Sequence, residues 1–458
     1  PAPGCGHRPG LSRMSGQPLR LWGLQLAGLL LLGLLVGLAC WPLNLMDHAQ
    51  DLLLHQLPGF SGDSWTPRTL AIALAPVGVM PLLLLLQAGR LARGAGSGIP
   101  QTLESIENPS QAPLLMAPFA TVARLALWSA ASLALMPLGR EGPVVQVGAA
   151  VAHALRRRFP SLLAGISPAS LMAIGAGAGL AGGFNSPLMG TVFVFEELTG
   201  RFQPSVIWPA AVVCSAAALL SNIDGIPLFT LGVDQTLRPE WQQLLWALPL
   251  GVGGGLLGGL FSRILWQGTS LLRPRLRKRP LVWGLGLGMA LGLLALASGG
   301  WSGGDGEALM VLLLDGQGSL PVPGSPLSIV GWLLLLLARI GAPVLALAAG
   351  IPGGLIDPAF AIGALFGSGT MELLGADAQL GLALGMASGL AGATQLPLMT
   401  VLFALRMAGD QQWLFGILLS AVIGAAIGRK IQPEPIYHAL WQLGRSPDQL
   451  PDQRAPRR

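Results

Sequence analysis

The sequence predicts an all-α protein that crosses a membrane many times. Only 10% of its 458 residues are charged, against about 25% in soluble proteins. The mean hydropathy is +0.62, and long apolar segments recur with short polar breaks between them. The sequence contains 65 glycines and 37 prolines. This high content is typical of membrane helices that pack tightly or are interrupted within the bilayer. We therefore expect an integral, multi-pass membrane protein.

The remaining composition narrows the classes of function. The net charge of +6 lies largely in loops and tails, so we interpret it as membrane topology and expect no nucleic-acid partner. The three cysteines and five histidines are scattered without motif spacing. We therefore expect no disulfide, no metal centre and no cofactor.

The apolar segments define the candidate helices. Several are shorter than the ~20 residues that a membrane-spanning helix needs. Short segments interrupted by glycine or proline, in matching positions of two halves, indicate a transporter with a binding site near the bilayer midplane. The segments cover about residues 21–43, 69–89, 112–138, 143–154, 168–183, 187–198, 205–221, 241–266, 280–298, 327–349, 358–374, 379–393, 396–408 and 413–428.

The domain organisation follows from these segments. We expect an N-terminal cytoplasmic tail at 1–20, a transmembrane transport domain at 21–445 and a C-terminal tail at 446–458. Because the last predicted helix covers about 433–444, we expect no sizeable soluble domain after it. The basic loop at 273–279 is expected on the cytoplasmic side by the positive-inside rule.

An internal repeat divides the transport domain into halves at about 21–221 and 241–445. Residues 175–198 align with residues 385–408 without gaps, and nine of the 24 pairs are identical. Upstream of each copy, Gly139-Arg-Glu-Gly-Pro143 matches Gly354-Leu-Ile-Asp-Pro358. The alignment does not decide whether the two halves are parallel or inverted.

Glu141 is the first candidate functional residue. It lies between two glycines, where Pro143 opens an apolar helix. A carboxylate inside a membrane costs several kcal/mol, so an ionisable residue there indicates function. The N-terminus of a helix favours negative charge, and a site that accepts a carboxylate also accepts a small anion. The alternative is a structural ion pair with Arg140.

Two glycine-rich segments could provide donors for such an anion. Ser97, in Gly96-Ser-Gly-Ile-Pro100, offers a hydroxyl beside free backbone amides; the alternative is an ordinary turn in which serine caps a helix. In the segment 350–358, the amides near Ile356 could face an anion, while Asp357 before Pro358 is typical of a helix cap. The alternative there is a Gly-Pro kink.

Glu197 and Tyr437 complete the set of candidates. Glu196 and Glu197 end an apolar helix where the second repeat has Arg406-Met407, so the repeat itself does not require acids there. The alternative is a solvated helix end. Tyr437 is the only tyrosine beside 13 tryptophans. It is either an interfacial aromatic residue or a hydroxyl placed for a purpose.

Together these motifs resemble the CLC family of chloride channels and proton-coupled chloride transporters. The resemblance runs in order along nearly the whole chain, from about 20 to 445. Its motifs are GSGIP at 96–100, GREGP at 139–143, the Gly-Leu-Ala to Phe-Glu-Glu segment at 179–197, GGLIDP at 353–358 and the late Tyr437. It implies an inverted repeat of about eighteen tilted and partial helices. It also implies a homodimer with one pathway in each subunit.

The resemblance also implies a role for each candidate. Ser97 and Tyr437 would bind chloride through their hydroxyls, and Ile356 and Asp357 would bind it through backbone amides. Glu141 would be the gating glutamate that competes with the anion and accepts the outer proton, and Glu197 the inner proton glutamate of the exchangers. We therefore expect a chloride/proton antiporter, with chloride, protons and lipid as its partners, in a bacterial inner membrane.

The sequence leaves rival functions open. The nearest is a passive chloride channel on the same fold, and a fluoride exporter is disfavoured by the intact GSGIP and GREGP motifs. An intramembrane enzyme would need a Ser-His, paired-Asp or His-metal constellation, which the sequence does not display. The chain departs from the family where Ile356 replaces a phenylalanine and Asp357 follows it. We expect Asp357 to cap its own helix rather than face the anion.

Overall fold

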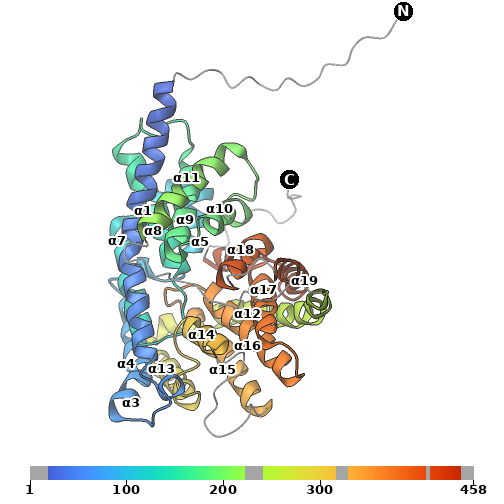
Figure 1. The fold of residues 1–458 in the computed structure, drawn as a ribbon. Helices are drawn as coiled ribbons and strands as arrows, with labels where there is room; N and C mark the ends of the chain where they lie inside the picture. The colour runs from blue at the N-terminus through green and yellow to red at the C-terminus, as the bar shows by residue number, and fades with distance from the viewer. Residues whose placement is uncertain (1–18, 222–240, 316–328, 409–412, 445–458) are drawn as a thin grey trace, which may run out of the picture.

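A computed structural model describes residues 19–221, 241–315, 329–408 and 413–444. These residues form an all-α fold, as predicted (Figure 1). Three predicted features lie outside the described residues: the tails at 1–20 and 446–458 and the division near 222–240. The one exception is the end of the N-terminal tail, because the first helix already begins at Leu19. Among the described residues only one isolated β-bridge joins extended backbone, and it pairs Gly139 with Gly354.

Within the described residues the first half contains eleven α-helices and the second half nine. Two of these twenty, α2 and α6, are single turns of four residues. The first half contains α1 (Leu19–Leu54), α2 (Pro58–Ser61), α3 (Pro67–Ala73), α4 (Ala75–Ala88), α5 (Ile99–Glu107), α6 (Ala112–Leu115), α7 (Pro118–Leu133), α8 (Glu141–Arg158), α9 (Pro168–Phe184), α10 (Pro187–Phe193) and α11 (Pro204–Ser221). The second half contains α12 (Gln242–Lys278), α13 (Pro280–Ala297), α14 (Glu307–Asp315), α15 (Ile329–Ala348), α16 (Ile356–Leu373), α17 (Ala378–Thr394), α18 (Pro397–Ala408), α19 (Leu414–Ile431) and α20 (Ile436–Gly444).

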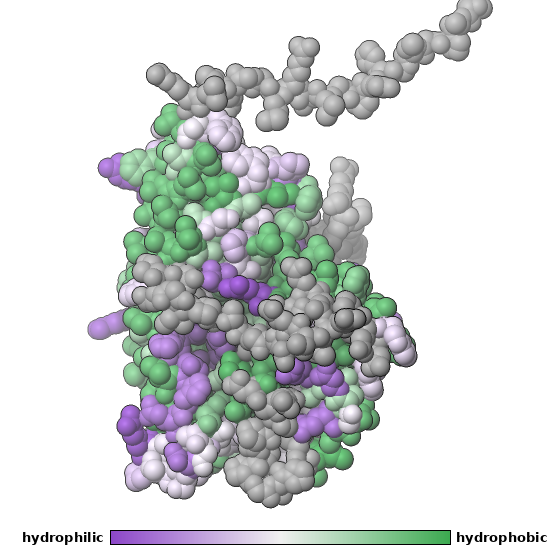
Figure 2. All heavy atoms as spheres, in the orientation of Figure 1, coloured by the Kyte–Doolittle hydropathy of each residue, from purple (hydrophilic) through white to green (hydrophobic). Residues whose placement is uncertain are grey.

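Apolar length and surface mark this as a multi-pass membrane protein. Seven segments of the described chain are long and apolar enough to cross a bilayer, and an eighth arises if the pair Pro109–Leu115 and Pro118–Leu133, bent by 57°, counts as one span. Figure 2 shows hydrophobic residues spread widely over the visible surface. The seven segments are Trp22–Leu54, Pro67–Ala88, Pro204–Ser221, Leu244–Lys278, Pro280–Ala297, Ile329–Ala348 and Leu414–Gly444.

The short Gly/Ala-rich segments are buried rather than exposed to lipid. Helices α9 and α17 lie at the centre of their halves, where α9 packs on α8 and α11 while α17 packs on α16 and α19. Glycine permits the close packing: a Cβ added at Gly148 would lie 1.9 Å from the carbonyl oxygen of Gly175, and one at Gly363 would lie 2.2 Å from that of Gly385. The same device therefore joins the matching helices of both halves.

The internal repeat is confirmed in the backbone. Asn185, the residue directly after helix α9, has a φ of 47°, and the matching Gln395, directly after α17, has a φ of 62°. Both residues adopt the left-handed backbone conformation, which is uncommon for residues other than glycine, so the two repeats share an unusual local structure. The matching Gly139 and Gly354 pair in antiparallel fashion, as an inverted repeat requires. In Figure 1, α8 to α11 gather in the upper part of the molecule and α16 to α19 at the lower right.

Candidate anion and proton site

The beginnings of three helices meet at the centre of the molecule. Ser97 lies just before α5, Glu141 begins α8, and Asp357 lies in the first turn of α16. Gly139 and Gly354 exchange reciprocal backbone hydrogen bonds of 3.1 and 2.7 Å, which fix the start of α8 against the start of α16. Because each helix start presents unsatisfied N–H groups, the meeting point favours an anion.

The Glu141 carboxylate already occupies this meeting point. The residue is fully buried, and its Oε1 accepts a hydrogen bond from the Asp357 backbone N–H at 2.6 Å. The carboxylate lies against the bare backbone of the glycine pair, since a Cβ added at Gly354 would be 1.2 Å from Oε2. Among the described residues Oε2 has no hydrogen-bond partner. The side chain thus places a negative group on an amide of the opposite half.

Two hydroxyls next to Glu141 are unsatisfied. The hydroxyl oxygens of Ser97 and Tyr437 are buried, and the part of the chain that the structure describes gives neither a hydrogen-bond partner. Ser97 lies against the start of α8, because a Cβ added at Gly142 would be 2.6 Å from the serine hydroxyl oxygen. The Tyr437 hydroxyl lies within electrostatic range of the Glu141 and Asp357 carboxylates. Since buried donors are usually satisfied, these hydroxyls favour a bound ligand.

Buried arginines hold the glycine-rich loops in place, a feature that the sequence analysis missed. The Arg124 guanidinium donates to the carbonyl oxygens of Gly96 at 3.1 Å and Ala95 at 2.9 Å, which fixes the loop of Ser97. In the second half, Arg339 donates to three successive carbonyls, those of Ser302, Gly303 and Gly304. Each arginine lies 15 residues before the glycine of the central pair, so the repeat relates them.

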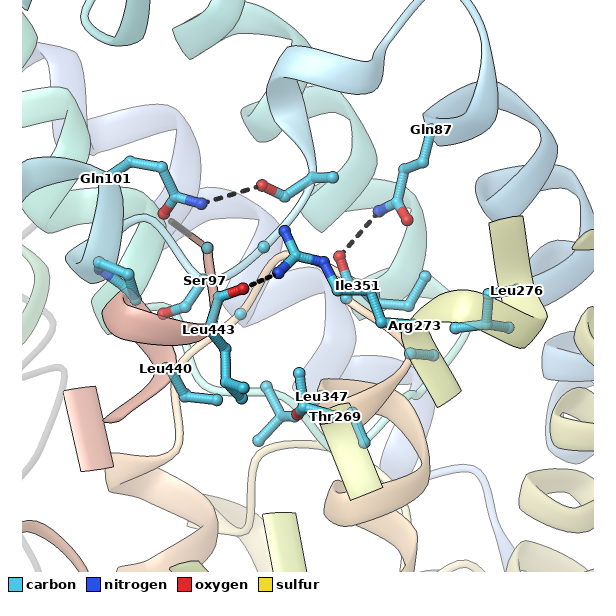
Figure 3. Close-up of a pocket in the computed structure, with 18 of the residues that line it drawn as sticks. Gln87, Ser97, Gln101, Thr269, Arg273, Leu276, Leu347, Ile351, Leu440 and Leu443 are labelled. Carbon is cyan, nitrogen blue, oxygen red and sulfur yellow. Dashed lines mark hydrogen bonds between the residues drawn. The ribbon is translucent and has the colours of Figure 1, made fainter. Parts of the chain in front are cut away.

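A cavity of about 880 Å³ leads to the site (Figure 3). Gly96, Ser97 and Gly353 line it near the helix starts, and Arg273 and Arg277 of α12 line it as well. Figure 3 shows the Arg273 guanidinium donating to the Leu443 carbonyl, and Gln87 donating to the Gly350 carbonyl at 3.1 Å. The two arginines outnumber the one acidic residue of the lining, Glu104, so the wall carries net positive charge that attracts anions.

The expectation that Asp357 caps its own helix is wrong. Helix α16 begins at Ile356, one residue earlier, and its N-cap is Leu355 without a side-chain bond. Both Asp357 carboxylate oxygens are buried and accept no hydrogen bond from any described residue. The Ala359 N–H, which a cap at Asp357 would use, donates instead to the Leu355 carbonyl at 3.0 Å. A second carboxyl group therefore lies unsatisfied beside that of Glu141.

We expect replacement of Asp357 by asparagine to tighten chloride binding at least about tenfold, because two unit charges 4 Å apart repel by about 4 kcal/mol at an effective dielectric of about 20. Isothermal titration with chloride measures this. Asp377→Asn is the matched control, since Asp377 is a true cap that accepts the N–H groups of Gln379 and Leu380 at 2.9 and 3.2 Å. Unchanged chloride affinity in Asp357→Asn would show that this carboxyl carries no charge toward the anion.

Arg140 does not serve as the ion-pair partner of Glu141. Its guanidinium pairs with Asp47 of α1, lies 3.9 Å from Glu307 of α14, and stands 5.0 Å over the Phe184 ring. Asp47, Asp305 and Glu307 place their carboxylate oxygens within 4.8 Å of one another, so the buried cation has several counter-charges. Asp47 lies four residues beyond the predicted apolar segment 21–43, and the sequence analysis did not single it out.

The two acids of the Glu196-Glu197 pair have different environments. Glu196 accepts the N–H groups of Leu398 and Met399 at 3.0 and 2.7 Å, so it caps the start of α18. Glu197 lies in a short π-helix, Val194–Leu198, and is buried. Its Oε1 is 3.3 Å from Nδ1 of His438, which the sequence analysis did not single out. The interpretation of this pair as a solvated helix end therefore does not apply to Glu197.

Comparison with known proteins agrees with this arrangement. The profile described as "Voltage gated chloride channel" matches residues 77–429. The chain belongs to this family, the CLC family. A curated relative, the H(+)/Cl(-) exchange transporter ClcA of Vibrio parahaemolyticus, is 30% identical over 337 residues, covering 70% of this chain and 69% of the relative. ClcA of Yersinia pestis is 30% identical over 329 residues, covering 67% of this chain and 64% of that relative.

Solved structures of the CLC family share the fold. A slow cyanobacterial Cl−/H+ antiporter superposes with a TM-score of 0.72 at 21% identity, covering 94% of this chain and 99% of that structure. A CLC-type fluoride/proton antiporter superposes with a TM-score of 0.71 at 23% identity, covering 93% and 99%. These likenesses establish the CLC fold for this chain.

Proposed function

We propose that this CLC protein exchanges chloride for protons, and that the Glu141 carboxylate occupies the anion site until it is protonated. One observation carries the proposal: Glu141 Oε1 accepts the backbone N–H of Asp357, at the helix start that the sequence assigns to an anion. The curated relatives at 29–30% identity are named as H(+)/Cl(-) exchange transporters, which supports the same function. The protein is on this proposal a transporter and not an enzyme.

The proposed mechanism gives each side chain a separate task. A proton on Glu141 neutralises the carboxylate and weakens its bond to the Asp357 amide. Chloride then takes that place, held by the amides of Ile356 and Asp357 and by the hydroxyls of Ser97 and Tyr437. Glu197 supplies the proton from the inner side. Because the ionised Glu141 carboxylate and chloride replace one another at one place, movement of each ion depends on the other.

The wild-type protein in liposomes tests this proposal. With a chloride gradient as the only driving force, we expect chloride efflux to move protons into the vesicle against their own gradient. Recording chloride and pH in parallel measures both ions. Chloride movement without any proton movement would favour the passive channel. Fluoride is the second candidate substrate, because a fluoride/proton antiporter shares this fold. Repeating the experiment with fluoride in place of chloride tests it.

We also propose a homodimer in a bacterial inner membrane, on the resemblance to the CLC family. Light scattering of the detergent-solubilised protein tests the assembly. A protein mass of about one chain, 47.3 kDa, would contradict the dimer. We place the face that bears Arg273 and Arg277 on the cytoplasmic side, since basic segments remain there.

A further inference from the structure

His438 connects the buried Glu197 to the surface. It lies in α20, directly after Tyr437, and its Nδ1 is 3.3 Å from Glu197 Oε1. The Glu197 side chain is only 2% exposed, whereas the His438 side chain is 36% exposed. The pair therefore reaches from an acid without direct solvent access to a ring that touches solvent.

The surroundings of Glu197 argue against a purely structural role for the contact. Its neighbour Glu196 holds the start of α18 through two backbone bonds, whereas no backbone N–H in the described ranges donates to Glu197. The charged and titratable groups around the pair are few. Glu196 is adjacent in the chain, and the Tyr437 hydroxyl interacts electrostatically with Glu197. Glu104 of α5 is engaged by the Trp441 Nε1–H at 2.7 Å.

Helix α20 separates this pair from the chloride cavity. Leu440, Trp441, Leu443 and Gly444 of α20 line the cavity, and neither His438 nor Glu197 is among its lining residues. Tyr437, whose buried hydroxyl interacts electrostatically with Glu141 and Asp357, lies one residue before the histidine. One short helix thus carries both a hydroxyl near the anion site and an imidazole near the buried acid.

We propose that His438 transfers protons between water and Glu197 along a route separate from the chloride cavity. The inference rests on the proposed chloride/proton exchange. Nε2 of the neutral ring, which carries its hydrogen on Nδ1, takes up a proton from water. The Nδ1–H bond of the resulting imidazolium then breaks as an O–H bond forms on Glu197, and a flip of the ring restores the starting tautomer. Histidine suits this step because its charge ordinarily changes between about pH 5 and pH 8.

The test compares His438→Gln and His438→Ala with wild type in liposomes under a chloride gradient. We expect both variants to move at least about fivefold fewer protons for each chloride ion, because a positioned acid–base group is lost. Added imidazole should restore proton movement in His438→Ala. The control is His55→Gln, which removes a histidine paired with Asp51 at 3.4 Å elsewhere in the protein.

Three outcomes would overturn the inference. Proton movement at the wild-type rate in both variants means that His438 is not on the route. Proton and chloride movement falling together, without recovery in imidazole, means that the histidine only supports the fold. If the wild-type protein moves chloride without protons, the proposed exchange fails and this inference fails with it; normal wild-type exchange with unaffected variants contradicts this inference alone.

Discussion

Replacement of Glu141 by alanine is expected to abolish proton movement while chloride still crosses the membrane. The variant removes the carboxylate that is bonded to the Asp357 amide, so chloride can bind that amide without competition from Glu141. We expect coupled proton flux to fall by more than about tenfold, which corresponds to a rise of over ~1.4 kcal/mol in the activation free energy of proton transport. Chloride efflux should be at least as fast as in wild type. Chloride and proton fluxes from liposomes measure both effects.

The control for this variant is Glu107→Ala, which removes an exposed acid from the end of α5. It should leave both fluxes at the wild-type level. If Glu141→Ala still moves protons against their gradient, another group carries them and Glu141 is not the gate. If it moves neither ion, the side chain serves the structure of the pathway rather than its gating.

Replacement of Gly354 by alanine is expected to remove Glu141 from its site by steric exclusion. A Cβ at this position would lie 1.2 Å from Oε2 and 3.0 Å from Cβ of Glu141, so the carboxylate has to leave the Asp357 amide. The displaced charge remains buried and without its donor, which costs several kcal/mol. We expect coupled exchange to fall more than about tenfold, measured by the same flux assay.

A double variant separates this clash from general damage. In Glu141→Ala with Gly354→Ala the carboxylate is absent, so chloride movement should return to within about twofold of Glu141→Ala alone. Gly286→Ala is the matched control, because a Cβ at this helical glycine meets nothing within 4 Å. Failure of the double variant to recover would place the effect of Gly354 in backbone packing and not in the Glu141 side chain.

The sequence predicted those features that depend on local signals. Hydropathy, the repeat and the GREGP motif were enough for the fold class and for Glu141 at a helix start. Local patterns determine these features because helix starts, stops and apolar length are set by neighbouring residues. The sequence analysis did not predict the left-handed backbone at Asn185 and Gln395, which the structure places at matching positions of the two repeats.

Contacts between distant segments were beyond the sequence. The residues around Arg140 in the sequence do not indicate that its partner is Asp47, 93 residues earlier. The sequence likewise gives no sign that His438 lies close to Glu197. The Asp357 prediction failed because helix α16 begins earlier than its local pattern suggests. Leu355 is the N-cap, and the Ala359 N–H that Asp357 would have accepted donates to the Leu355 carbonyl at 3.0 Å.

Chloride binding as a function of pH tests the central claim most directly, that the Glu141 carboxylate and chloride compete for one site. Isothermal titration of the wild-type protein should show chloride binding at least about tenfold tighter near pH 5 than near pH 8, because protonation removes the competing carboxylate. In Glu141→Gln, which has no carboxylate at residue 141 to compete, the change in affinity between the two pH values should be much smaller, and what remains comes from Asp357. A wild-type affinity that does not change with pH, or an equal change in Glu141→Gln, would contradict the account.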